Sequence, residues 1–224
     1  MGIKVPKKKY KDTKDKNMKN AIKIISVFLI TIILFTTAII TYHYIVKERA
    51  YNDKLLEETM DLSVKQGATP DETFRNFLLM IPNDVTKLLL QEGWGYSLNS
   101  SEEMLEIAKQ YGYEDGLLGL CDYQNKIIYV SEDRMETVIH EVYHAVDSIL
   151  GFPSKNNESI YNTEHDTFLK QFPLVSEDNT DNVMEYFAEA FQRYIINGSQ
   201  LKKSCPETYD YLTSVIEICK NRLY

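Results

Sequence analysis

The sequence contains two histidines four positions apart, His140 and His144, in the pentapeptide HEVYH. On a helix such residues project from one face, so both imidazoles can bind one zinc ion at about 2.0–2.1 Å per bond. Glu141 follows the first histidine and can accept a proton from a water that zinc activates for attack on a peptide carbonyl. With only four histidines in the chain, this pairing arises by chance in ~1 in 200 sequences of this kind. The motif therefore predicts a zinc-dependent peptidase with Glu141 as the general base.

The surrounding residues predict the helix that this motif requires. Ser131 is followed by two acids, which suits a helix start, and the pattern runs to Gly151, with Pro153 two residues further on. At 100° per residue the two histidines lie opposite an apolar stripe, with Glu141 beside them. That stripe comprises Met135, Val138, Ile139, Val142, Val146 and Ile149. Histidines that only filled the core would lie within the stripe, so their separation favours a site.

A third ligand is expected from a later helix, DNVMEYFAEAFQRYIINGS. Its apolar stripe is formed by Val183, Phe187, Phe191 and Tyr194. Glu185 and Glu189 lie on the opposite side, so one carboxylate can bind zinc and the other can hydrogen-bond a ligand histidine. Glu164 and His165 are the competing ligands, and they fall in a segment that reads as a loop-like insert, PSKNNESIYNTEHD.

HEVYHAVD followed by EYFAEAF resembles the catalytic domain of anthrax lethal factor and its relatives, the bacterial Pro-Pro endopeptidases. The resemblance extends over roughly residues 71–224, and the segment CPETYDYL is similar to the last helix of that family. It implies a gluzincin-type zinc metalloendopeptidase with His140, His144 and Glu185 as zinc ligands and Glu141 as general base. It further implies that Asp147 and Glu189 hold the ligands in place.

The sequence departs from this family at one point. The family usually has a tyrosine several residues before the third ligand, where its hydroxyl supports the oxyanion, and the stretch LVSEDNTDNVM has none. Tyr161 and Tyr143 are conceivable substitutes. Two alternatives to an active peptidase therefore stay open. One is a catalytically weak or inactive surface binding module that retains the zincin fold, and the other is a nonenzymatic structural protein with a chance motif.

The N-terminal part has a different composition from the rest. Residues 1–23 carry nine lysines against two aspartates, a net charge of +7, so the remainder of this −8 chain carries −15. Residues 24–46 contain no Asp, Glu, Lys or Arg and give roughly 35 Å of helix, enough to cross a bilayer core of about 30 Å. The span is longer than the apolar region usual for a cleaved signal peptide, which is the alternative.

These features predict four segments. They are a cytoplasmic leader (1–23), a transmembrane helix (24–46), a juxtamembrane stalk (47–69) and a zinc metallopeptidase domain (70–224). Since lysines accumulate on the cytoplasmic side of membranes, the domain is expected outside the cell, at a bacterial cell surface. We expect a protein or peptide substrate and no nucleic acid.

The domain is predicted to be α+β, a mainly helical zincin-like metallopeptidase domain with a small β-hairpin or sheet. Helices are expected from Pro70, near 83–91 and after Ser100 or Ser101, with a short strand at 96–98. A hairpin is expected with strands at 118–122 and 127–130. Cys121, Cys205 and Cys219 are expected to be buried free thiols, because a helix of fourteen residues would hold the last two about 21 Å apart.

Overall fold

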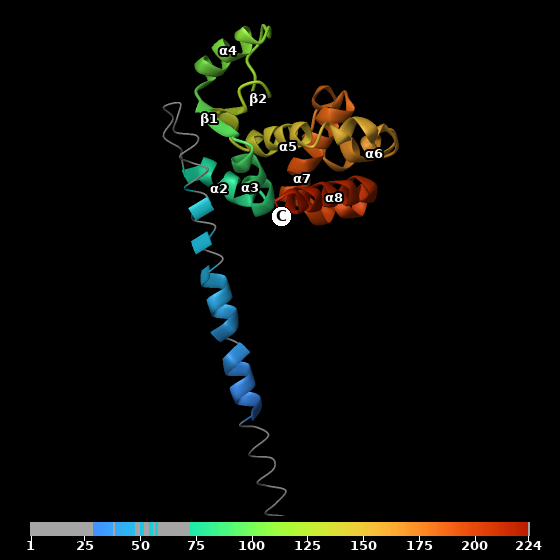
Figure 1. Cartoon of the computed structure of the whole chain (residues 1–224). Helices are drawn as coiled ribbons and strands as arrows, with labels where there is room; N and C mark the ends of the chain where they lie inside the picture. Colours follow the sequence, from blue (N-terminus) through green and yellow to red (C-terminus); the bar gives the residue numbers. More distant parts are fainter. Residues whose placement is uncertain are drawn as a thin grey trace, which may run out of the picture. The chain divides into compact units, whose positions relative to one another are not determined.

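The computed structural model describes residues 29–37, 39–47, 50–51, 54–55, 57 and 72–223 (Figure 1). The chain divides into two compact units, Met1–Tyr51 and Asn52–Tyr224. The predicted leader and most of the predicted stalk lie outside the described residues.

The first unit contains the helix Leu29–Lys47, which has a mean hydropathy of 1.9. Among the described residues it is the one helix long and apolar enough to span a membrane, a test that an N-terminal signal sequence also passes. Its threonines return their hydroxyls to the helix backbone, since Thr36 donates to the Ile33 carbonyl at 2.9 Å and Thr41 to the Thr37 carbonyl at 2.9 Å. Polar side chains are thereby satisfied within an apolar segment.

The second unit is mainly helical with one small sheet, as predicted. Its α-helices are α2 (Glu72–Met80), α3 (Asn83–Gln91), α4 (Ser101–Gln110), α5 (Thr137–Ile149), α6 (Glu158–Gln171), α7 (Val183–Ser204) and α8 (Pro206–Arg222). Its strands are β1 (Gly95–Asn99), β2 (Gly119–Asp122) and β3 (Ile127–Ser131). Short 3-10 turns are η1 (Glu132–Arg134), η2 (Pro153–Asn156) and η3 (Glu177–Thr180).

The three strands form a sheet in the order β1-β3-β2. β2 and β3 are the predicted antiparallel hairpin, with Gly119 opposite Val130 and Asp122 opposite Ile127. β1 joins the other side of β3 in parallel, a pairing that the sequence did not indicate. β2 is therefore an edge strand of this sheet.

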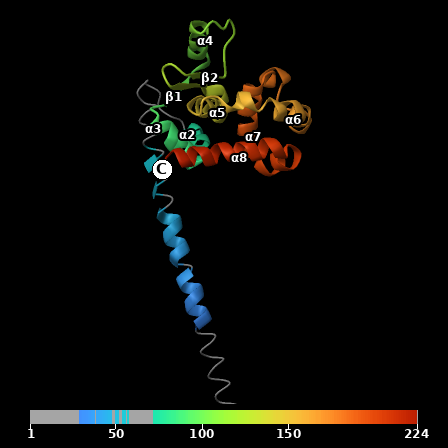
Figure 2. The same cartoon turned by 45° about the vertical axis from the view of Figure 1, so that its right-hand side comes forward.

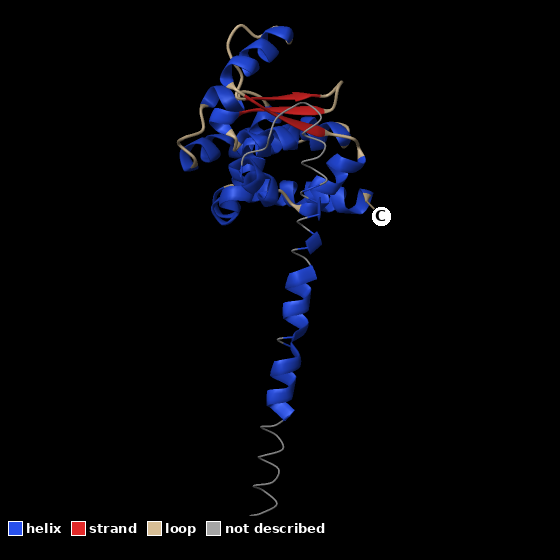
Figure 3. Ribbon diagram, turned by 90° about the vertical axis from the view of Figure 1, so that its left-hand side faces the viewer, coloured by secondary structure: helices blue, strands red, loops and turns tan. Residues whose placement is uncertain are grey.

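The sheet lies over α5, and α4 lies on the far side of the sheet (Figures 1, 2 and 3). α7 packs against both α5 and α8, so α5 is held between the sheet and the C-terminal helices. Val138, Ile139 and Val142 of α5 are fully buried, as are Phe187 and Phe191 of α7. The apolar stripes predicted for both helices thus face one common core.

Two sequence expectations are corrected. The segment expected to be a loop-like insert contains α6, so Glu164 and His165 lie on a helix. The helix expected from Ser131 begins at Thr137, because Ser131 caps the separate turn η1 by accepting the Asp133 amide at 3.3 Å.

All three cysteines are buried and free. The prediction of free thiols is confirmed.

Candidate metal centre

α5 presents its two histidines on the side opposite its buried stripe. His144 is 6% exposed, and the side chain of His140 is 13% exposed. Both line a cleft of about 610 Å³, together with Glu141, Glu185 and Glu189. The helix thereby separates a core face from a face that carries the chemistry.

α7 brings Glu185 to the same place from its first turn. Asn182 is the N-cap, and its side-chain oxygen accepts the amides of Met184 at 3.0 Å and Glu185 at 3.2 Å. A cap of this kind satisfies amides that have no partner within the helix. The backbone of Glu185 is therefore fixed directly by the residue that starts the helix.

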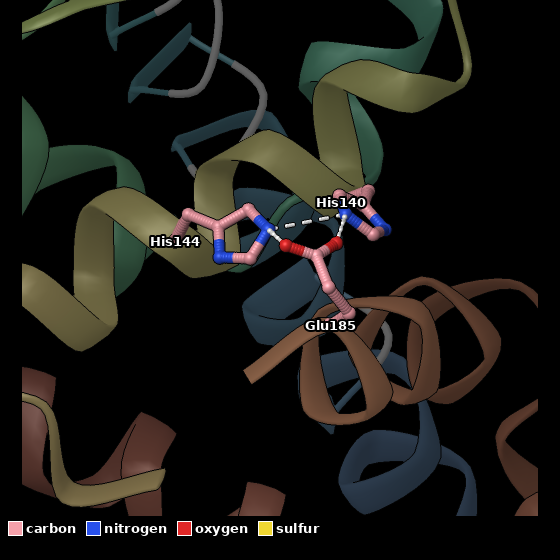
Figure 4. A group of neighbouring side chains, drawn as sticks. All are labelled: His140, His144 and Glu185. Atoms are coloured by element: carbon pink, nitrogen blue, oxygen red, sulfur yellow. Dashed lines mark hydrogen bonds and ion pairs between the residues drawn. The ribbon is translucent and has the colours of Figure 1, made fainter. Parts of the chain in front are cut away.

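The three side chains converge (Figure 4). Glu185 Oε2 lies 3.1 Å from His140 Nε2, and Glu185 Oε1 lies 3.4 Å from His144 Nε2. The two histidine Nε2 atoms are 3.1 Å apart. The Glu185 carboxylate thus faces both imidazoles, although Glu185 follows His140 by 45 positions in the chain.

These donors suit zinc. In a tetrahedral site with bonds of about 2.0–2.2 Å, neighbouring ligand atoms are roughly 3.3–3.6 Å apart. One ligand atom from each of the three residues lies within 4.8 Å of the others. Two imidazole nitrogens and a carboxylate oxygen form a donor set typical of catalytic zinc, which leaves one position for water or substrate.

The charges around His140 also favour a cation. Burial lowers the pKa of His140, but hydrogen bonds with Glu185 and Glu189 and the charge of Glu141 outweigh it and raise the pKa to about 10. Burial raises the pKa of Glu185, but hydrogen bonds with His140 and His144 outweigh it and lower the pKa overall. The negative charges of the surrounding carboxylates, which favour the protonated imidazole, would equally favour a bound metal ion.

Glu141 lies in the same cleft and differs from Glu185 in its surroundings. It is 8% exposed, and burial raises its pKa, while the two histidines act in the opposite direction. A carboxylate whose pKa is raised toward neutrality is better suited to pass a proton in both directions.

Residues 111–215 match the protein family described as "Anthrax toxin lethal factor, N- and C-terminal domain". The predicted resemblance is confirmed, and the match includes both histidines, Glu141 and Glu185. No curated protein was found to match the sequence.

The structure is similar to that of the Pro-Pro endopeptidase PPEP-2 from Paenibacillus alvei. The TM-score is 0.52 and the sequence identity 23%, over 66% of this chain and 94% of that one. The lethal-factor-like domain thus shares its fold with that endopeptidase.

Glu189 lies one turn beyond Glu185. Its Oε2 lies 3.6 Å from His140 Nδ1, and its Oε1 accepts from Arg193 at 2.5 Å. Burial raises the pKa of Glu189, but these two partners lower it overall. Glu189 is thus placed to orient the His140 ring from the side away from Glu185.

Asp147 has a different partner from the one the resemblance implied. Its carboxylate accepts the Ser154 amide at 3.0 Å and the Ser154 hydroxyl at 2.6 Å. Among the described residues, His144 Nδ1 is buried without a hydrogen-bond partner. Asp147 therefore fixes the turn after α5. Burial raises its pKa, and the hydrogen bonds from Ser154 and the charge of His144 act in the opposite direction.

The structure gives the competing ligands other roles. Glu164 accepts the amides of Glu207 at 3.1 Å and Thr208 at 2.9 Å at the start of α8. His165 Nε2 lies 2.8 Å from the Thr180 hydroxyl. Neither side chain is among the residues that line the cleft.

The two tyrosines considered as oxyanion donors also lie elsewhere. Tyr143 is fully buried, with its hydroxyl 3.2 Å from that of Tyr211, and Tyr161 donates to the Asp181 carbonyl at 3.4 Å. Two other tyrosines, Tyr113 and Tyr123, line the cleft. Sequence reasoning missed both. The position of Tyr123 directly after the predicted strand 118–122 was the available signal.

Proposed function

We propose that this protein is a zinc metalloendopeptidase that hydrolyses peptide bonds, with His140, His144 and Glu185 as ligands and Glu141 as general base. The observation that carries this proposal is the convergence of the two Nε2 atoms and the Glu185 carboxylate, with separations of 3.1–3.4 Å. The family match and the fold shared with an endopeptidase support it.

When bound, zinc supplies a Lewis acid that polarises a carbonyl and lowers the pKa of water. The chain's own residues do the rest. Glu141 takes up a proton at its carboxylate as water attacks and returns it to the leaving amine. Glu189 and Arg193 keep the His140 ring oriented, since Glu189 Oε2 lies 3.6 Å from His140 Nδ1.

We further propose that the domain acts outside the cell, anchored by one transmembrane helix at residues 24–46. The apolar helix Leu29–Lys47 supports this proposal by its length and composition, and the lysine-rich residues 1–23 support an N-terminus in the cytoplasm.

The test uses full-length protein purified in detergent, together with Glu141→Gln and Glu217→Gln. Glu217 is an exposed residue paired with Lys220 at 3.7 Å, so its variant controls for loss of a carboxylate. Zinc content is measured by elemental analysis and turnover on a fluorescence-quenched peptide library. We expect about one zinc per chain in all three proteins.

Turnover should fall about 10²–10⁴-fold in Glu141→Gln and stay unchanged in Glu217→Gln, because proton transfer contributes that much to the rate. Zinc binding without turnover in the wild type would instead indicate an inactive binding module. Absence of zinc would indicate that the motif arose by chance.

A further inference from the structure

Gly119 of β2 lies against the side chain of Glu141. An ideal Cβ built on Gly119 would lie 2.5 Å from Glu141 Oε1, 2.7 Å from Cγ and 2.9 Å from Cδ. Contacts this short do not occur for a real Cβ, so any side chain at this position would force Glu141 to move. Three atoms of one carboxylate side chain thus occupy the space that a side chain at 119 would fill.

The backbone gives no other reason for a glycine here. Gly93, Gly112 and Gly151 are the described glycines with positive φ, and Gly119 lies in regular strand geometry opposite Val130. Strands favour β-branched and aromatic residues and are weakened by glycine. The glycine at position 119 is therefore explained by the space that the Glu141 side chain occupies.

The other residue of β2 on the same face points to the same conclusion. Alternate residues of a strand share a face, and Cys121 is buried and lines the same cleft as Glu141. Burial and the charge of Glu141 both raise the pKa of the Cys121 thiol. On the face of β2 toward Glu141, position 119 thus has no side chain and position 121 has a small one. The backbone of Glu141 itself belongs to α5.

We infer that Gly119 is a positioning residue, whose lack of a side chain lets Glu141 occupy its place between β2 and α5. This inference rests on the proposed function, because it assigns Glu141 the role of base. We expect the effect to act through Glu141 and not through zinc, because the three atoms nearest to a Cβ at 119 all belong to Glu141.

The first test is a double-mutant cycle in stability, which needs no activity. Full-length protein in detergent and excess chelator is unfolded by heat as wild type, Gly119→Ala, Glu141→Ala and the double variant. Gly119→Ala should lower Tm by about 3–6 °C in the wild-type background. It should lower Tm little or not at all with Glu141→Ala, because that change removes the clashing atoms.

Gly116→Ala is the matched control. A Cβ at Gly116 would meet nothing within 4 Å, and its φ is not positive, so Tm should stay unchanged in both backgrounds. An equal loss of Tm from Gly119→Ala in both backgrounds would overturn the inference, since glycine would then serve the strand alone.

The second test is turnover on the peptide library. Gly119→Ala should bind zinc as the wild type does and lose about 10–100-fold in kcat, because a displacement of about 1 Å has effects of that size. The KM of Gly119→Ala should be unchanged, and so should the turnover of Glu217→Gln, because Glu217 is not among the residues that line the cleft. Wild-type turnover in Gly119→Ala would overturn the inference. A wild type without turnover would refute the proposed function, and the stability cycle would still decide whether Gly119 makes room for Glu141.

Discussion

Three carboxylates lie around His140, and their positions suit three tasks. Glu185 faces both histidine Nε2 atoms, Glu189 faces His140 Nδ1, and Glu141 lies beside them under β2. A carboxylate that faces the metal-binding nitrogens can bind the metal. A carboxylate that faces the other ring nitrogen of a ligand histidine sets the orientation of that ring. Replacing each by glutamine keeps the shape and removes the charge, so the three variants should differ in zinc affinity.

Glu185→Gln should weaken zinc binding by more than about 100-fold, beyond the 10–100-fold that outer partners contribute. Glu189→Gln should weaken zinc binding or turnover by about 10–100-fold. Competition titration against a chromophoric chelator measures both affinities.

Glu164→Gln and His165→Ala serve as controls and should bind zinc normally, because these residues contact the start of α8 and Thr180. Normal zinc affinity in Glu185→Gln with weakened affinity in either control would show that the third ligand was misassigned.

Among individual residues, the proposed zinc ligands and general base could be predicted from the sequence, but the residues around them in the cleft could not. The two histidines and Glu141 follow from spacing on one helix, and Glu185 from a carboxylate pair on another. Gly119 and Tyr123 reach the cleft through strand pairing and the packing of β2 on α5. These are contacts between distant segments, and no local pattern reveals them.

At the scale of elements, the N-terminus of α7 matters most, because Glu185 is in its first turn. The cap at Asn182 holds the amide of the proposed ligand itself. Loss of the cap would let that turn fray and increase the motion of the carboxylate.

Asn182→Ala should therefore lower the free energy of unfolding by about 0.5–2 kcal/mol and weaken zinc binding. Chemical denaturation and zinc titration measure the two effects. Asn182→Asp is the matched control, since its carboxylate can accept the same amides and should restore both properties. An alanine variant as stable as the wild type would show that the cap contributes nothing.

Most helices and strands could be read from the sequence because local signals agree with tertiary packing. α3 has the predicted bounds, and α4 has a capping box between Ser100 and Glu103. α6 was missed because its apolar side is narrow, with Phe168 and the polar Glu164 as its buried residues. Glu164 is buried because it caps α8, a partner about 40 residues away that its own segment does not reveal.

For the whole molecule, zinc should act as a clamp between α5 and α7, because its proposed ligands come from both helices. A ligand that binds only the folded state stabilises it by about 4 kcal/mol at 1,000 times its Kd.

Zinc at that excess should raise Tm by roughly 10 °C over chelator-treated protein. Thermal unfolding followed by circular dichroism measures the shift. Glu185→Gln should show a much smaller shift at the same zinc concentration, and Glu217→Gln the full shift. An identical Tm with and without zinc would argue against a metal centre.

The proposed orientation in a membrane also concerns the whole chain. Protease added to intact cells should degrade a C-terminal epitope and spare an epitope in residues 1–23, because the lysine-rich leader is expected to stay in the cytoplasm. Lysed cells, in which both epitopes are accessible, provide the control.

A domain protected until lysis would contradict this topology. A domain recovered from the medium without its leader would identify residues 24–46 as a cleaved signal peptide.

The three buried thiols have a practical consequence for following motion in this protein. Cys121 is in β2, Cys205 joins α7 to α8, and Cys219 is near the end of α8. Burial is the first cause that raises the pKa of each thiol, to about 11 for Cys205 and Cys219, so each is shielded and poorly reactive while the fold is closed. An alkylating reagent added under native conditions therefore labels each cysteine at the rate at which its own neighbourhood opens. Without any engineered probe, mass spectrometry of the three labelled peptides can separate opening of the strand beside Glu141 from fraying of the C-terminal helix.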